Sequence, residues 1–228
     1  MASVSQAVAE VILGDPIIRQ CMARRVVNYR KLARTLQPAV SRILGKDVSV
    51  DAIKIALLRF SKSLGEERGV RREVLEILAR SSVELRTDIT IVILRSTAIG
   101  YVAKLLTRIM SRARFVAVMQ STVAVTLVLD RETAEELLEK VSEEDIVEVQ
   151  RGQVAIVIVS PREIMRVLGV LAYITNVLSQ HGVNVVHIES CYTDTIIVVS
   201  RENLERVFSV LMKHIEGARE MLSLLRAS

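Results

Sequence analysis

The first 64 residues carry apolar positions that recur every three or four residues, which is the spacing of amphipathic helices. One helix is predicted to begin at Asp15-Pro16, with the aspartate as N-cap and the proline as the first helical residue. A second should run from Asn28 to Gly45, and a third from Ser49 to about Leu64. Pro38 falls on the polar side of the second helix, which it is expected to kink or split.

After a further helix near residues 70–80, the pattern changes to short apolar runs that alternate with helical segments. The first series has the order strand, helix, strand, strand, helix, strand. Its strands are predicted at residues 83–95, 113–121, 122–129 and 145–150, and its helices at 97–110 and 131–141. The same order then begins again, with strands at 153–159, 183–190 and 194–200 and helices at 163–181 and from about 202.

Matching residues support an internal repeat. Gly100 matches Gly169 at a displacement of 69 residues, and Arg131-Glu132 matches Arg201-Glu202 at a displacement of 70. Each series has the element order of a ferredoxin-like fold. The repeat therefore predicts two α+β units in tandem.

The predicted fold class is α+β. A helical, helix-turn-helix-like module over residues 1–80 should precede two tandem ferredoxin-like βαββαβ domains, over 83–150 and 153–228. Each domain would leave edge strands that need covering, and the last helix keeps an apolar stripe past the expected end of the fold. These features favour a homodimer or a larger homo-oligomer.

The second series contains two short motifs, Leu168-Gly169-Val170-Leu171-Ala172 and Gly182-Val183-Asn184-Val185. They resemble the P-G-V-L-A helix start and the G-I-N-I strand start of ACT domains, with leucine in place of the proline. The first series retains Ile99-Gly100-Tyr101-Val102-Ala103, whereas Ala113-Arg114-Phe115-Val116 lacks the asparagine. The resemblance covers residues 83–215 and is greatest to the tandem pair of aspartate kinases. The N-terminal segment VVNYRKLARTL resembles that of archaeal predicted regulators of amino-acid metabolism.

The resemblance to ACT domains implies a site for a small ligand, namely an amino acid. Glycine has no Cβ, so a ligand can approach the backbone at a helix start, where free N–H groups and the helix dipole favour a carboxylate. Asn184 has both a donor and an acceptor for the rest of the ligand. In the alternative interpretation, Gly169 lets the helix pack on the sheet and Asn184 makes a turn hydrogen bond. The predicted ligand-binding residues are Leu168, Gly169, Val170, Asn184 and Val185.

Charge is unevenly distributed along the chain. Residues 1–80 hold 15 Lys and Arg against 8 Asp and Glu, a net charge of +7, whereas residues 81–228 have a net charge of −2. The basic side chains lie on the outer faces of the first helices, as in a module that contacts phosphates. The predicted nucleic-acid contacts are Arg30, Lys54, Arg59 and Lys62. The alternative is the solvated surface of a scaffold or interaction module.

Several classes of function lack support in the sequence. No apolar run is long enough to span a bilayer and no secretory signal is visible, so a cytoplasmic protein without membrane contact is expected. Cys21 and Cys191 lack metal-ligand spacing and are expected to be reduced thiols in the core. Nucleotide-binding motifs are missing, and the three histidines are scattered. We therefore predict no catalytic residues, no metal site and no cofactor.

The leading hypothesis is a non-enzymatic regulator, in which an amino acid bound to ACT-like domains changes how the helical module meets DNA or a protein. The second is a regulatory subunit that docks on a biosynthetic enzyme such as an aspartate kinase and binds no nucleic acid. The third is a structural oligomeriser whose pocket has lost its function.

Overall fold

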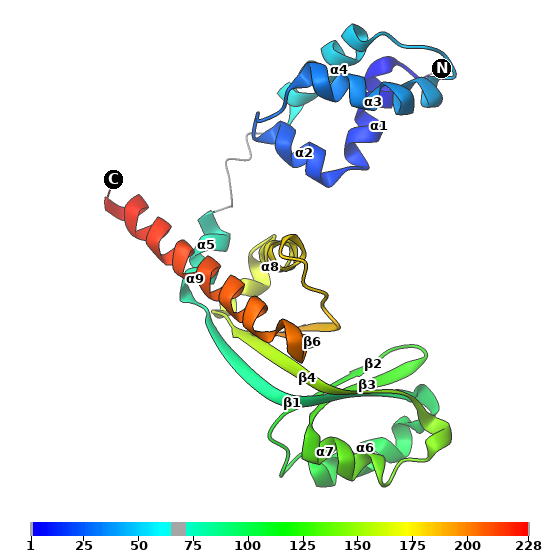
Figure 1. Cartoon of the computed structure of the whole chain (residues 1–228), viewed down its shortest axis with the longest axis vertical. Helices are drawn as coiled ribbons and strands as arrows, with labels where there is room; N and C mark the ends of the chain where they lie inside the picture. Colours follow the sequence, from blue (N-terminus) through cyan, green and yellow to red (C-terminus); the bar gives the residue numbers. More distant parts are fainter. Residues whose placement is uncertain (1, 65–71, 228) are drawn as a thin grey trace. The chain divides into compact units, whose positions relative to one another are not determined.

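The computed structural model describes residues 2–64 and 72–227 (Figure 1). Contacts divide the chain into two compact units, Met1–Arg71 and Arg72–Ser228. The first is helical, and the second combines helices with a β-sheet.

Four α-helices make up the described part of the first unit: α1 (Val4–Leu13), α2 (Pro16–Ala23), α3 (Tyr29–Leu44) and α4 (Val50–Ser63). The last three confirm the predicted helices, and each begins with the expected cap. The side chains of Asp15, Asn28 and Ser49 accept hydrogen bonds from backbone N–H groups of the following turn. The sequence prediction missed α1, although Ser3 and Gln6 form a capping box at its start.

Pro38 does not split α3, which runs without a break from Tyr29 to Leu44, so the expected split was wrong. The proline is exposed, and water can therefore satisfy the carbonyl that loses its helical partner. Gly45 ends the helix in the left-handed conformation, at φ 63°. The unit is held by one apolar core, formed by Ala7, Val8, Ile12, Met22, Ala33, Leu36, Val40, Val48, Ile53, Ala56 and Leu57.

The second unit is built on one six-stranded antiparallel sheet of order β2-β3-β1-β4-β6-β5. Its strands are β1 (Ser82–Arg95), β2 (Val116–Gln120), β3 (Ala124–Asp130), β4 (Ile146–Val159), β5 (His187–Cys191) and β6 (Asp194–Ser200). Its α-helices are α5 (Arg72–Arg80), α6 (Ile99–Ile109), α7 (Arg131–Leu138), α8 (Val170–Gln180) and α9 (Leu204–Ala227). The predicted repeat of elements is present, since β3 and β6 begin 70 residues apart, at Ala124 and Asp194.

The sequence predicted two separate domains, but the strands of both series belong to one continuous sheet. The predicted strands 145–150 and 153–159 form the single strand β4, and β1 is equally long. One half has the ferredoxin-like strand order β2-β3-β1-β4. In the other half, the place of the fourth strand beside β4 is taken by the start of β1, where Ser82–Arg86 pairs with Ala155–Val159. The start of β1 therefore completes the second series, although it comes before all other elements of that series in the chain.

Irregularities in the middle of β1 and β4 allow both strands to pass from one half to the other. The register between them shifts between Arg86 and Ile89, where Asp88 has a positive φ of 56°. Gly152 of β4 also has a positive φ, of 67°. Such bulges bend a strand and increase its twist. An apolar cluster then joins the halves, because Ile89, Ile91 and Val128 pack with Ala155 and Val198.

Helix α5 packs against α9, and the structure groups it with the second unit rather than with the preceding helices. Arg219 of α9 holds the end of α5. Its Nε donates to the Ala79 carbonyl at 2.9 Å and its Nη2 to the Ser81 carbonyl at 3.1 Å. A cation suits the negative end of a helix dipole.

The cysteines differ from the expected core thiols. Both are free, but Cys191 is exposed at the end of β5 and Cys21 is only half-buried. None of the described helices combines the length and the hydrophobicity that crossing a bilayer requires.

Candidate functional site

Helix α8 begins without a side-chain cap. Gly169 is its N-cap residue, one position before the first turn in which the sequence placed it, with φ 94° and ψ 2°. Helices α1 to α4 and α7 all begin with a side chain that accepts a backbone hydrogen bond. The first N–H groups of α8 have no acceptor within the helix, and they lie at the positive end of its dipole. This helix start can therefore receive an anion.

Gly169 is required for its backbone conformation and not for packing. A Cβ built on it would meet no atom of the chain within 4 Å, so the interpretation that it lets the helix pack closely on the sheet gains no support. Its φ lies in the region that L-residues disfavour.

Gly169→Ala is therefore expected to lower the free energy of unfolding by about 1–2 kcal/mol, the cost of a left-handed conformation for a residue with a Cβ. Gly100→Ala is the control, because Gly100 matches Gly169 in the sequence repeat and lies in the first turn of α6, with open space around it and no positive φ. Alanine there should be neutral or slightly stabilising. Urea unfolding of both variants checks this, and equal effects would contradict it.

The loop before Gly169 contains a short helical turn, Arg162–Arg166, and a hollow of about 180 Å³. Arg162, Glu163, Met165 and Arg166 line this hollow. Glu163 accepts a hydrogen bond from Nη1 of Arg80 at 3.2 Å. A hydrogen bond from its own backbone N–H, together with Arg80, lowers the pKa of Glu163. The hollow thus presents guanidinium groups and an ionised carboxylate, which the sequence analysis missed. The only available signal was the run of alternating charges in PREIMR.

The predicted ligand residues differ in what they can contribute. Leu168 is 71% exposed and follows the lining residue Arg166 by two positions in the chain, and Met165 of the lining is exposed as well. Val170 is buried, so its side chain belongs to the core and its backbone N–H is what remains for a ligand.

The structure does not bring Asn184 and Val185 to this site. The strand begins at His187, so both residues lie in the loop between α8 and β5, where Asn184 is exposed and Val185 half-buried. Strand β6 pairs with both β5 and β4. Through Val198 of β6, the first residue of β5 is aligned with Ala155 of β4, and through Asp194 its last residue is aligned with Val159. The α8 start and Asn184 are therefore at opposite ends of an eleven-residue helix, about 16 Å long at 1.5 Å per residue. Within one chain the predicted residues therefore form two groups, with Leu168, Gly169 and Val170 at the start of α8 and Asn184 and Val185 beyond its end.

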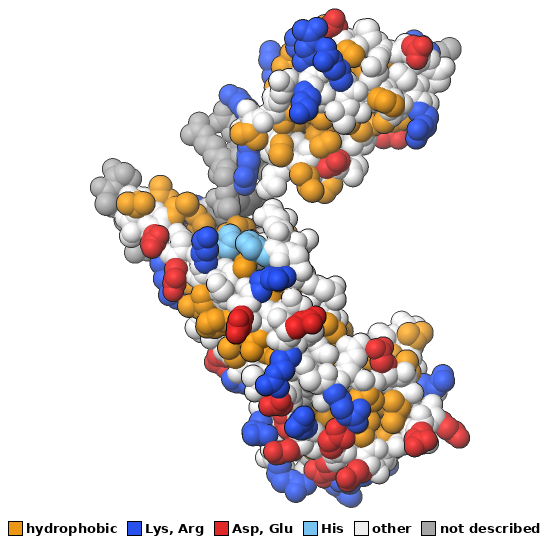
Figure 2. Space-filling model, in the orientation of Figure 1, with side chains coloured by type: hydrophobic (Ala, Val, Ile, Leu, Met, Phe, Trp, Pro, Cys, Tyr) orange, Lys and Arg blue, Asp and Glu red, His pale blue; other side chains and the backbone are white. Residues whose placement is uncertain are grey.

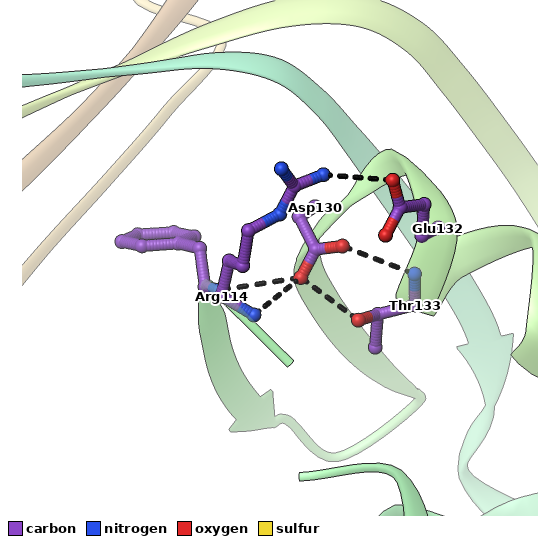
Figure 3. Close-up of polar contacts among 5 residues, drawn as sticks. Arg114, Asp130, Glu132 and Thr133 are labelled. Carbon is purple, nitrogen blue, oxygen red and sulfur yellow. Dashed lines mark hydrogen bonds and ion pairs between the residues drawn. The ribbon is translucent and has the colours of Figure 1, made fainter. Parts of the chain in front are cut away.

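A second polar constellation is centred on Asp130, the N-cap of α7 (Figure 3). One carboxylate oxygen accepts from the backbone N–H of Arg114 at 2.9 Å and of Phe115 at 3.2 Å, and from Oγ1 of Thr133 at 2.8 Å. The other accepts from the Thr133 N–H at 3.1 Å. Burial alone would raise the pKa of Asp130, but these hydrogen bonds outweigh it and lower the pKa. Asp130 fastens β3 to α7 and to the segment before β2.

The first unit carries the predicted nucleic-acid contacts on two helices. Arg30 is exposed on α3, and Arg59 and Lys62 are exposed on α4, whereas Lys54 is half-buried. Helix α4 also exposes Ile55 (51%) and Leu58 (39%). Figure 2 shows basic and apolar side chains mixed on the visible face of this unit.

Ion pairing differs between the two units. Of the basic residues described in the first unit, ten form no ion pair, namely Arg19, Arg24, Arg30, Lys31, Arg34, Arg42, Lys46, Lys54, Arg59 and Lys62. In the second unit many arginines pair with carboxylates, including Arg80 with Glu163 and Arg151 with Glu135. The described part of the first unit therefore keeps most of its positive charge uncompensated.

Part of the second unit matches a known protein family. Residues 148–213, from β4 into α9, match the family model of the ACT domain. A search of curated proteins finds no significant match to the chain. The match covers less than a third of the chain, and the matched segment contributes most of β4, with β5 and β6, to the antiparallel sheet.

Solved structures show a similar fold in aspartate kinases. The enzyme from Synechocystis superposes with a TM-score of 0.50 at 18% identity, over 60% of this chain and 27% of that chain. Aspartokinase III of E. coli in complex with aspartate and ADP gives a TM-score of 0.49 at 21% identity, over 59% and 33%. The regulatory subunit of aspartate kinase from Thermus flavus gives 0.49 at 14% identity, over 58% and 95%. The matched region thus spans about a third or less of these complete kinases.

Proposed function

We propose that this chain is a non-enzymatic regulator that binds an amino acid at the start of α8. The observation that carries the proposal is an uncapped helix N-terminus that directly follows a hollow lined by arginine and glutamate side chains. The family match to an ACT domain and the fold shared with aspartate kinases agree with a regulatory role.

The chemistry of the loop suits a zwitterion. The free N–H groups at the start of α8, with Arg162 or Arg166, would hold the carboxylate of the ligand. Glu163 would accept from the ammonium group, because one partner, Arg80, leaves part of its carboxylate available. Met165 and Leu168 would cover an apolar side chain of the ligand.

Isothermal titration calorimetry of the full chain against the twenty amino acids tests this site. For the amino acid that binds, Arg166→Gln is expected to raise Kd at least about tenfold, the loss of one charge-assisted hydrogen bond of roughly 1.5–3 kcal/mol. Amidation of the ligand carboxylate should have a similar effect. Arg108→Gln, an exposed change on α6, is the control. Unchanged affinity in Arg166→Gln and for the amide would reject the site.

Asn184→Ala belongs in the same titration, because Asn184 lies at the far end of α8. If it weakens binding, a second copy of the chain must supply the asparagine.

Self-assembly of the chain is part of the proposal. The edge strands β2 and β5 each pair on one side only within the described residues, and Met221 and Leu224 are exposed near the end of α9. We propose a homodimer or a larger homo-oligomer.

For the first unit we propose binding to duplex DNA through α4 and Arg30. The unpaired basic side chains support this, because phosphate contacts provide most non-specific affinity. A second candidate is docking on a biosynthetic enzyme without DNA binding. The exposed Ile55 and Leu58 favour it, since apolar side chains in the middle of α4 suit a protein partner better than a phosphate backbone.

A further inference from the structure

The C-terminal end of α8 brings together two histidines from different helices. His181 is the C-cap residue of α8, and His214 lies on α9. Their ring centroids are 6.3 Å apart, with the rings nearly perpendicular at 85°. Figure 2 shows histidine side chains next to each other on the molecular surface. Tyr173, two turns before His181 on α8, also contacts His214, and its hydroxyl lies 2.6 Å from Nδ1 of that ring.

Hydrogen bonds hold the Nδ1 atom of each ring. Nδ1 of His181 lies 2.8 Å from the Val177 carbonyl. A carbonyl can only accept, so this nitrogen carries the proton, and Nε2 of the neutral ring keeps its lone pair. Nδ1 of His214 can likewise donate to the Tyr173 hydroxyl, which leaves Nε2 of His214 free. Imidazoles that bind metal ions are typically fixed in this way, with one nitrogen bonded to a carbonyl or a similar group and the other facing the metal.

An imidazole binds a metal ion through the lone pair of its neutral ring. The carbonyl groups at the end of α8 form the negative end of its dipole, which favours a cation beside His181.

We propose that His181 and His214 bind one divalent transition-metal ion, such as Zn²⁺, through their Nε2 atoms. With Zn–N bonds of about 2.0–2.1 Å, two imidazoles on one tetrahedral ion have ring centroids about 5 Å apart, so the rings need to approach by roughly 1 Å. Rotation of the exposed His181 side chain would supply this movement, and it would lengthen the hydrogen bond to the Val177 carbonyl. The described residues include no cluster of three or more His, Cys, Asp and Glu that could hold a metal, so water completes the coordination and the ion exchanges readily.

The bound ion would link the end of α8 to α9, two helices that already pack together. Because the metal binds the folded chain, it should raise the thermal stability of the second unit. Imidazole ligands favour Zn²⁺, Ni²⁺ and Cu²⁺ over Mg²⁺, which prefers oxygen ligands. This selectivity separates coordination by histidine from general attraction of cations.

The test is titration of the EDTA-treated full chain with ZnCl₂ at pH 7.5, followed by calorimetry and by thermal unfolding. One ion per chain and a rise in Tm are expected, with no response to MgCl₂. His181→Gln and His214→Gln should each raise the Kd for Zn²⁺ at least tenfold. His187→Gln is the matched control, because His187 lies on β5 and should leave the affinity unchanged.

His181→Gln is the decisive variant, because this exposed side chain can change without disturbing the core. Histidine NMR spectra give a second readout that does not depend on the variants, since Zn²⁺ should shift the ring signals of His181 and His214 but not those of His187. Lowering the pH to 5.5 should weaken binding, because protons compete for Nε2. A titration without saturation, or an equal loss in His187→Gln, would overturn the proposal.

Discussion

Replacing Asp130 with alanine is expected to lower the free energy of unfolding of the second unit by about 2–3 kcal/mol, because it removes a helix cap and leaves buried donors without a partner. Asp130 is 6% exposed, and its carboxylate accepts hydrogen bonds from the N–H groups of Arg114, Phe115 and Thr133 and from the Thr133 hydroxyl. Water cannot reach all of these donors once the side chain is gone. Denaturation by urea at pH 7 measures the loss.

The effect of Asp130 should depend on pH. Its pKa is lowered in the folded chain, because the hydrogen bonds to the carboxylate outweigh burial. A carboxylate with a lowered pKa stabilises the fold fully above its unfolded pKa, at about 3.9, and loses this contribution as the pH falls through the folded value. The difference between wild type and Asp130→Ala should therefore be largest at neutral pH and shrink below about pH 4.

Glu132→Gln provides the control for Asp130. Glu132 lies two residues away and pairs with Arg114 at 3.0 Å, but the side chains of this ion pair are 70% and 80% exposed. Exposed pairs contribute little, so this variant should change stability by less than about 1 kcal/mol. If both variants lost the same stability, the hydrogen bonds of the buried carboxylate would not be the cause.

Reversing the charge of Lys54, Arg59 and Lys62 together is expected to weaken binding of the full chain to mixed-sequence duplex DNA at least about a hundredfold at low salt. Each lost phosphate contact should also reduce the slope of log K against log salt by about 0.9. Stability should change little, because Ile53 and Leu57 hold α4 from its buried face. Fluorescence anisotropy at several salt concentrations measures both quantities.

A matched triple variant separates a local effect from the loss of net charge. Lys104, Arg108 and Arg206 are exposed in the second unit, and reversing them changes the net charge by the same amount. This control should retain most of the affinity and the salt slope. If wild type shows no DNA binding, the docking alternative is favoured, and Ile55→Ser with Leu58→Ser should then release an enzyme partner in a pull-down.

Local signals in the sequence determined much of the fold. Caps such as Asn28 and Ser49 act within one turn, so the starts of α3 and α4 could be predicted from neighbouring residues. The spacing of apolar residues is also a local property, and it predicted the order of strands and helices in both series of the second unit. Gly169 was predicted beside the start of α8 for the same reason.

Tertiary structure decided how these elements combine. The pairing of Ser82–Arg86 with Ala155–Val159 joins segments about seventy residues apart, and no local pattern specifies such a partner. The candidate ligand site likewise depends on distance in space, because the helix length separates Asn184 from Gly169. The contacts of Arg80 with Glu163 and of His214 with Tyr173 join residues 83 and 41 positions apart, and they depend on the packing of α9 against α5 and α8. A sequence determines which conformations its short segments prefer, but the contacts that build a site arise from long-range packing.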